Sequence, residues 1–145
     1  MNETLVTVLG NICGDVTIRD TNSGYRVTSF RLASTPRRFR NGAWEDGVTS
    51  YFTVNCWRTL AENVYASVHR GDPVVVQGVM RVRTWQRTDG TNATSVELEA
   101  QTLGFDLARG NGTFTRVRHT PAVVVETPAS AEEAGGDSWA APAVA

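Results

Sequence analysis

Residues 50–57 read Ser50-Tyr51-Phe52-Thr53-Val54-Asn55-Cys56-Trp57, an alternating run that is typical of a half-buried β-strand. Successive side chains of a strand point to opposite faces. One face therefore carries Phe52, Val54 and Cys56, which are predicted to lie in the core. The other face is polar in the middle and aromatic at both ends, since it carries Tyr51, Thr53, Asn55 and Trp57. A hydrophobic barrel wall has no need of Thr and Asn between its rings, so this second face is predicted to be a binding surface.

Four more strands and one helix are predicted around this run. The strands are expected over residues 5–9, 25–33, 73–87 and 95–103, with turns at 20–24 and 88–91 and a long polar loop from Ser34 to Thr49. A capping box, Thr59 to Glu62, is expected to begin the helix. Leu60, Val64 and Val68 follow at helical spacing, and His69-Arg70-Gly71 is expected to end the helix.

Five strands with one helix between the third and the fourth is the order of an OB-fold, a partly open Greek-key barrel. The fold class is therefore predicted as all-β with one short helix, in the form of a five-stranded OB-fold barrel. A sixth run, Thr113 to Val117, is predicted to add an extra C-terminal strand at an edge.

Composition divides the chain at residue 118. Residues 1–118 carry all 14 cations, every one an arginine, against 11 of the 15 carboxylates, a balance of +3. Residues 119–145 carry four acids and no Lys or Arg, with eight alanines and three prolines. We predict an OB-fold domain over 1–118 and a flexible, weakly acidic tail over 119–145. The chain shows no secretory signal and no run of the roughly 18 apolar residues that a membrane span requires, so a cytoplasmic, nucleoid-associated protein is expected.

The strand over residues 73–87 presents a second unusual face. Val79 shares this face with three arginines and a tryptophan, namely Arg81, Arg83, Trp85 and Arg87. Unpaired charges are not buried, so this face meets either water or an anion. One alternative is a solvated edge on which arginine stems cover an exposed tryptophan. Glu97 and Glu99 on the following strand are interpreted as solvated carboxylates.

The loop after residue 33 repeats the combination of arginine and aromatic residues. Together the three segments supply rings on which bases stack and cations that follow phosphates, as binders of single-stranded nucleic acid require. Stacking is indifferent to base identity, so binding without sequence preference is predicted. The candidate DNA-binding residues are Arg37, Arg38, Phe39, Arg40, Trp44, Tyr51, Thr53, Asn55, Trp57, Arg81, Arg83, Trp85 and Arg87.

Enzymatic chemistry has little support in the sequence. It contains no phosphate loop, no nucleophile motif and no distinctive carboxylate pair, so we predict that the protein is not an enzyme and needs no cofactor. Cys13 and Cys56 are too few and too far apart for a metal site. They are either reduced thiols packed as small apolar residues or partners in a disulfide, within the chain or between subunits.

These residues resemble the bacterial single-stranded DNA-binding protein (SSB) family over about residues 3–107. The resemblance is carried by the order and spacing of Val8-Leu9-Gly10-Asn11-Ile12, Tyr51 to Trp57 leading into Leu60-Ala61-Glu62, Val76-Gln77-Gly78, and Met80 to Trp85 before Asp89-Gly90. It implies an OB-fold that assembles as a homotetramer and wraps DNA around its outside. The family's stacking aromatics fall on Phe39, Tyr51, Trp57 and Trp85. Residues 114–117 look like the extra strand with which the actinobacterial branch clamps neighbouring subunits.

The tail departs from the family pattern. Members typically end in aspartates followed by Pro and Phe, a tip that recruits replication and repair enzymes, whereas this chain ends in residues 140–145, Ala-Ala-Pro-Ala-Val-Ala. The nearest equivalent is Asp137-Ser138-Trp139. The sequence is therefore identified with an actinobacterial-type secondary paralogue in which tail-mediated recruitment is doubtful. Its predicted function is to bind and protect single-stranded DNA during replication, recombination or repair. The alternative is an OB-fold interaction module of the primosomal type, which would use the same aromatic face on a protein partner.

Overall fold

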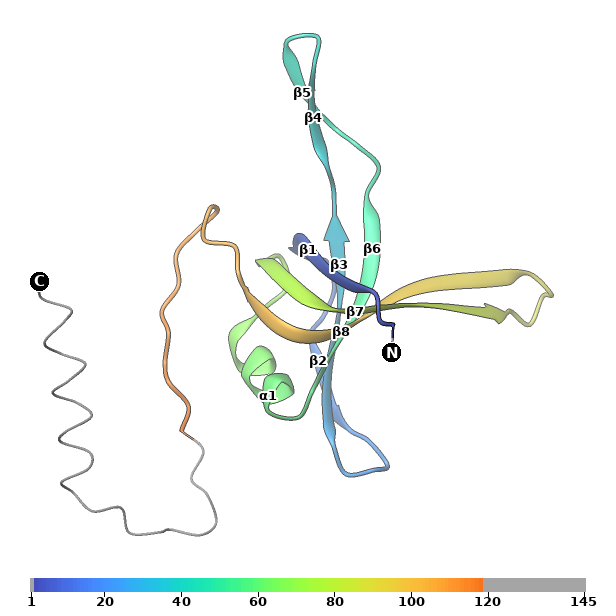
Figure 1. Ribbon diagram of the computed structural model, residues 1–145, viewed down its shortest axis with the longest axis vertical. Coiled ribbons are helices and arrows are strands. Elements are labelled where there is room, and N and C mark those ends of the chain that lie inside the picture. The colour runs from blue at the N-terminus through green and yellow to red at the C-terminus, as the bar shows by residue number, and fades with distance from the viewer. Residues whose placement is uncertain (1, 119–145) are drawn as a thin grey trace, which may run out of the picture. The chain divides into compact units, whose positions relative to one another are not determined.

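The structure, a computed structural model, describes residues 2–118, and Figure 1 shows how the strands and the helix of this part are arranged. The elements in this part of the chain are β1 (Leu5–Ile12), β2 (Thr17–Asp20), β3 (Arg26–Ser34), β4 (Arg37–Arg40), β5 (Ala43–Asp46), β6 (Ser50–Trp57), α1 (Arg58–Ser67), β7 (Pro73–Gln86) and β8 (Asn92–Phe105). The strand predicted from residues 50–57 is confirmed with the bounds that its alternation gives.

Strand pairing closes the main sheet into a ring. The strands follow each other in the order β1-β7-β8-β6-β3-β2, and β1 also pairs with β3, so β1, β7, β8, β6 and β3 form a closed circuit. The β6–β8 pairing is parallel, and the others in the circuit are antiparallel. With α1 between β6 and β7, this is the arrangement of an OB-fold. The predicted fold class is confirmed.

The inner faces of the ring make the core. Leu32, Val54 and Leu98, one from each of three neighbouring strands, are fully buried. Cys56 is also fully buried and Phe52 packs partly buried against the same cluster, as the alternation of β6 predicts. The helix adds Ala61 and Val64 to the buried set, and Val68, the residue after its last turn, is buried as well.

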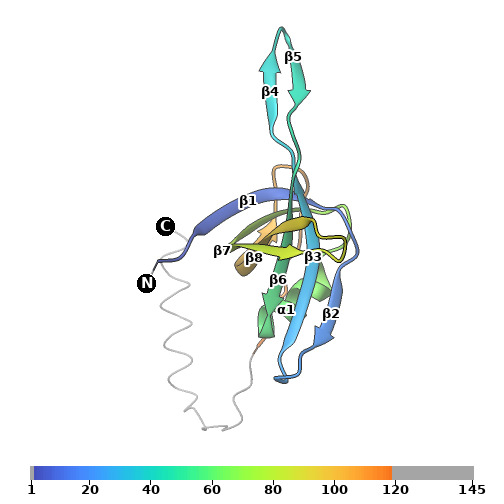
Figure 2. The same ribbon diagram turned by 90° about the vertical axis from the view of Figure 1, so that its right-hand side faces the viewer.

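Three strands, β2, β4 and β5, were not predicted from the sequence. The strand β2 has one central apolar residue, Ile18, and pairs only with β3 at the edge of the sheet. The predicted polar loop from Ser34 to Thr49 contains the hairpin β4–β5, whose strands contact each other and no other element of residues 2–118. Its two-residue turn, Asn41 and Gly42, has positive φ at both positions (54° and 80°), the geometry that Asn-Gly favours in tight hairpins. Figures 1 and 2 show this hairpin projecting from the ring.

The predicted helix caps are wrong. The helix α1 begins at Arg58 directly after β6, and the residue before it, Trp57, makes no capping side-chain hydrogen bond. Because no loop separates strand and helix, the chain turns at Arg58 itself, whose φ is 61°, and Thr59 falls inside the helix. At the other end α1 stops at Ser67, so His69-Arg70-Gly71 lies beyond the helix. The backbone N–H of His69 donates to Asp72 Oδ2 (2.8 Å) in the turn that leads to β7.

The extra C-terminal strand is a second correction. Residues 113–118 adopt no strand and pair with no strand of the described chain. A strand needs a partner for its backbone N–H and C=O groups, and within residues 2–118 this segment finds none. The compact unit that contains the ring ends at Gly112. The predicted tail, 119–145, and its Asp137-Ser138-Trp139 segment lie outside the described residues. No helix among the described residues is long and apolar enough to cross a membrane.

Candidate nucleic-acid interface

The two strand faces singled out in the sequence lie on one continuous surface. The strand β6 pairs with β8 so that Thr53 lies opposite Glu97 and Asn55 opposite Glu99. On its other side β8 places Glu97 opposite Arg81. Residues opposite each other on neighbouring strands share a face. We call this surface the outer sheet face; it comprises Ser29, Arg31, Tyr51, Thr53, Asn55, Trp57, Ser95, Glu97, Glu99, Arg81, Arg83 and Trp85.

The candidate aromatic rings are all exposed. Their exposed fractions range from 38% for Trp57 to 62% for Phe39, values that leave ring surface open to a ligand. Exposed aromatic rings of this kind are typical of interaction surfaces. Tyr51, Trp57 and Trp85 lie on the outer sheet face. Phe39 and Trp44 lie on the β4–β5 hairpin.

The polar centre of the outer sheet face is partly organised by a hydrogen bond. The hydroxyl of Ser29 donates to Asn55 Oδ1 at 2.7 Å between neighbouring strands. This bond occupies the amide oxygen of Asn55 and leaves its NH₂ group as the donor toward a ligand. Thr53 and Asn55 are half-buried, so they form the floor between Tyr51 and Trp57.

The glutamates of β8, predicted from the sequence to be solvated carboxylates, form ion pairs with arginines of β7. Arg81 Nη1 lies 3.2 Å from Glu99 Oε2, and Arg83 Nη1 lies 3.1 Å from Glu97 Oε2. Both pairs run diagonally between β7 and β8, because Arg81 is directly opposite Glu97. The side chain of Glu97 is only 22% exposed. Arg81 and Arg83, which were expected to face either water or an anion, therefore already form ion pairs with carboxylates of the same chain.

The hairpin residues form a separate cluster on their own two-stranded sheet. Phe39 and Trp44 are cross-strand partners and meet edge to face, with ring centroids 5.5 Å apart. The guanidinium of Arg37 lies 6.0 Å from the Trp44 ring and 3.2 Å from Asp46 Oδ1. This is the aromatic side of the hairpin.

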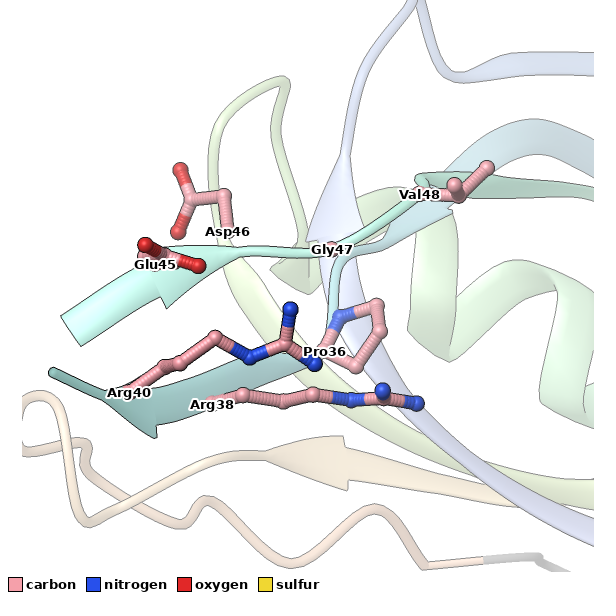
Figure 3. A pocket seen from close by; sticks show the side chains of 7 residues that line it. All are labelled: Pro36, Arg38, Arg40, Glu45, Asp46, Gly47 and Val48. Carbon is pink, nitrogen blue, oxygen red and sulfur yellow. The ribbon is translucent and has the colours of Figure 1, made fainter.

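The opposite side of the hairpin is charged. A surface hollow of about 320 Å³ is lined by Arg38, Arg40 and Glu45, which alternate onto this side, and also by Asp46, whose carboxylate pairs with Arg37. Figure 3 shows the two arginines extending in the same direction from β4, toward Pro36. The structure thus does not bring Arg37, Arg38, Phe39, Arg40 and Trp44 onto the outer sheet face; it presents them on a projecting arm.

Two arginine–tyrosine stacks were not predicted from the sequence. The guanidinium of Arg31 lies 5.0 Å from the Tyr51 ring centroid, and that of Arg58 lies 4.5 Å from the Tyr25 ring centroid. The alternation of β3 could have found Arg31, since it points away from the buried neighbours Phe30 and Leu32. The Arg58 stack has no signal in the sequence, because it depends on the positive φ that begins α1.

The end of the β7–β8 hairpin carries the last candidate residues. Trp85 lies opposite Ala93, a small residue that leaves the indole 45% exposed. Arg87 follows β7 in the turn, where its backbone N–H donates to the carbonyl of Thr91 at 2.7 Å. Its exposed side chain extends the arginine series of β7 past the sheet.

Both cysteines are free thiols. Cys56 is fully buried on the core side of β6, and this burial raises the pKa of its thiol to about 12. Cys13 is half-buried just after β1. The sequence left open whether the cysteines are packed reduced thiols or form a disulfide. In the structure Cys56 is a packed reduced thiol.

Comparison with known proteins gives a consistent result. The model of the Single-strand binding protein family matches residues 2–106. Over 118 residues the chain is 47% identical to Single-stranded DNA-binding protein 2 of Streptomyces avermitilis, covering 80% of this chain and 73% of that protein. Over 124 residues it is 44% identical to Single-stranded DNA-binding protein 1 of Streptomyces coelicolor, covering 84% and 78%. The crystal structure of a small single-stranded DNA-binding protein from Streptomyces coelicolor matches with a TM-score of 0.70 at 44% identity, covering 76% of this chain and 100% of that one.

Proposed function

The chain belongs to the single-strand binding protein family, and from this premise we propose that it binds single-stranded DNA by stacking bases on its exposed rings. The prediction of an actinobacterial-type member is confirmed by the Streptomyces relatives. The family is one of binding proteins, not of enzymes. The observation that carries the proposal is the continuity of the outer sheet face, which aligns Tyr51, Trp57 and Trp85 with arginines at its margins.

Base stacking supplies the affinity in this proposal. Stacking of a base on an aromatic side chain contributes about 1–3 kcal/mol, and every base has a face to offer. The free NH₂ of Asn55 and the hydroxyl of Thr53 donate to base edges between the rings without demanding one base. Arginines neutralise the phosphates, so affinity falls as salt rises. The projecting β4–β5 arm adds Phe39 and Trp44 at one end of the path.

We further propose that the protein acts as a homo-oligomer, a tetramer by the family resemblance. Leu5 and Leu9 alternate onto the same side of β1, and each is more than half exposed. Such side chains are expected where a second subunit packs. Light scattering on the full chain at micromolar concentration tests this assembly: the mass of four chains is the expected result, and the mass of one chain would reject it.

Coating of this kind protects single strands during replication, recombination or repair. The secondary-paralogue assignment depends on the tail and remains a prediction. Tail-mediated recruitment of other proteins is not part of the proposed function.

A fluorescence titration with oligo(dT) tests the binding proposal. We expect strong quenching of tryptophan emission, saturable at sub-micromolar protein, with log K falling against log[salt] by about 0.7 for each phosphate neutralised. Duplex DNA of the same length is the matched control, since its bases are already stacked, and it should quench weakly. Unchanged fluorescence together with unchanged anisotropy of a labelled oligo(dT) at micromolar protein would reject the proposal and favour the protein-interaction module.

A further inference from the structure

Four arginines on or beside the outer sheet face fall into two classes according to their partners. Arg81 and Arg83 are each held by a glutamate on β8, at 3.2 and 3.1 Å. A paired guanidinium and carboxylate have no net charge together. Such a pair therefore neutralises little phosphate charge and releases few of the counterions that are condensed on the DNA.

The second class consists of Arg31 and Arg58, the two arginines stacked on tyrosine rings. Neither forms an ion pair with any carboxylate among residues 2–118. Each guanidinium instead lies over a ring, Arg31 on Tyr51 at 5.0 Å and Arg58 on Tyr25 at 4.5 Å. A ring holds the planar guanidinium in place while leaving its full charge and its N–H donors available.

These two arginines flank the proposed path of the bases. Arg31 lies opposite Thr53 on the strand beside β6. Arg58 directly follows Trp57, at the other end of the polar floor. A strand whose bases stack on Tyr51 and Trp57 would therefore carry its phosphates past both guanidinium groups.

The backbone of Arg58 supplies an independent argument. Its φ of 61° lies in the left-handed region, which glycine adopts freely and a side chain with a Cβ does not. Strain of this kind persists at functional positions where the side chain is needed. A turn that served folding alone would be better made by glycine.

We propose that Arg31 on the outer sheet face and Arg58 beside it, at the start of α1, are phosphate-binding residues positioned by Tyr51 and Tyr25, whereas the Arg81–Glu99 and Arg83–Glu97 pairs form a neutral part of the surface. This inference rests on the proposed function, single-stranded DNA binding. It assigns the salt dependence contributed by this surface to two arginines that the sequence pattern did not single out.

The test measures the salt dependence of oligo(dT) affinity for a set of charge-matched variants of the full chain. Arg31→Gln and Arg58→Gln each remove one unpaired guanidinium from the path. Arg70→Gln removes the same charge from the exposed turn after α1, away from the outer sheet face. The double variant Arg81→Gln/Glu99→Gln removes both members of one neutral pair.

We expect Arg31→Gln and Arg58→Gln each to reduce the salt slope by about 0.7 and to weaken low-salt affinity roughly tenfold. Arg70→Gln and the double variant should keep the slope of the unmodified protein. A slope that is unchanged in Arg31→Gln and Arg58→Gln but reduced in the double variant would overturn the inference. If the unmodified protein failed to bind oligo(dT) at all, the proposed function would fail instead, so the two failures are distinguishable.

Arg58→Gly separates binding from folding. Glycine relieves the backbone strain at this position while it removes the guanidinium. We expect a melting temperature equal to or above that of the unmodified protein, combined with the same reduced salt slope as Arg58→Gln. If a folded Arg58→Gly protein kept both the oligo(dT) affinity and the salt slope of the unmodified protein, Arg58 would not belong to the site.

Discussion

The hydroxyl of Thr28 on β3 donates a hydrogen bond to the backbone carbonyl of Ala61 on α1, at a distance of 2.6 Å, and both residues are fully buried. It joins the helix to the sheet by a polar contact between two otherwise apolar surfaces. Because α1 begins one residue after Trp57, the bond also fixes the helix that sets the position of Arg58.

Replacing Thr28 by valine tests the contribution of this bond. Thr28→Val keeps the shape of the side chain and removes the donor. We expect the free energy of unfolding to fall by about 1–2 kcal/mol, measured by urea denaturation. Thr28→Ser is the matched control, since it keeps the hydroxyl and loses a methyl group. Thr28→Ser less stable than Thr28→Val would show that the methyl group, not the hydrogen bond, carries the contact.

Gly78 is required by the close approach of two strands. It sits at the irregularity in the β7–β8 register between Gln77 and Gly78. A Cβ atom there would collide with the backbone carbonyl of Glu99 and lie 2.9 Å from the Cα of Ala100. Backbone atoms on both strands would have to move, so we expect Gly78→Ala to lower the free energy of unfolding by about 3 kcal/mol or more.

Gly104→Ala is the control for that substitution. Gly104 lies on β8, and a Cβ atom there meets nothing within 4 Å. The melting temperature of Gly104→Ala should stay within a few degrees of the unmodified protein, while that of Gly78→Ala falls steeply or the variant does not fold. Equal melting temperatures for the two variants would contradict the steric argument.

The fold was predictable where a strand has one buried and one exposed face. The alternation of β6 places Val54 and Cys56 inside and Tyr51 and Trp57 outside without any knowledge of neighbours. The order of strands and helix then leads to the OB-fold. By contrast, β4 and β5 are exposed along their whole length. Their hydrophobic pattern therefore carries no strand signal, and only the Asn41-Gly42 turn marks the hairpin.

The sequence predicted which aromatic residues of the candidate site are exposed, but not which of its arginines are free of ion pairs. Whether an arginine is free depends on strand register, and register brings Glu99 to Arg81 from 18 positions away in the sequence. The stack of Arg58 on Tyr25 depends on a backbone conformation that propensity does not favour. The prediction of a capping box at Thr59 was wrong for a related reason: β6 continues into α1 without a loop, so the helix begins at Arg58 and Thr59 lies inside it.

The two thiols should differ sharply in reactivity. Burial raises the pKa of Cys56 from its ordinary value of 9.0 to about 12, so the thiolate that reacts is absent at neutral pH. We expect a disulfide reagent at pH 8 to modify one thiol per native chain, Cys13, and two in guanidinium chloride. Rapid modification of both in the native protein would contradict the buried position of Cys56.

The same shift has a consequence for stability at high pH. Above pH 9 the unfolded chain releases the Cys56 proton while the folded chain retains it up to about pH 12. The contribution of the buried, protonated Cys56 thiol to the free energy of unfolding is therefore fully present below pH 9 and is lost as pH rises toward 12. Urea denaturation at pH 8 and pH 10.5 should show a larger loss of stability for the unmodified protein than for Cys56→Ala.

Trp57 provides the most direct test of base stacking. Trp57→Ala removes a ring that is 38% exposed at the end of the polar floor, and we expect oligo(dT) binding to weaken by about 1–3 kcal/mol. Trp57→Phe keeps a stacking surface and should recover most of the affinity. The control is Tyr65→Ala on α1, which removes an exposed ring (47%) away from the outer sheet face. Because Trp57 lies opposite the buried Val27, the melting temperature of each variant must be measured alongside affinity. A folded Trp57→Ala protein that binds oligo(dT) as tightly as Tyr65→Ala would remove Trp57 from the stacking path.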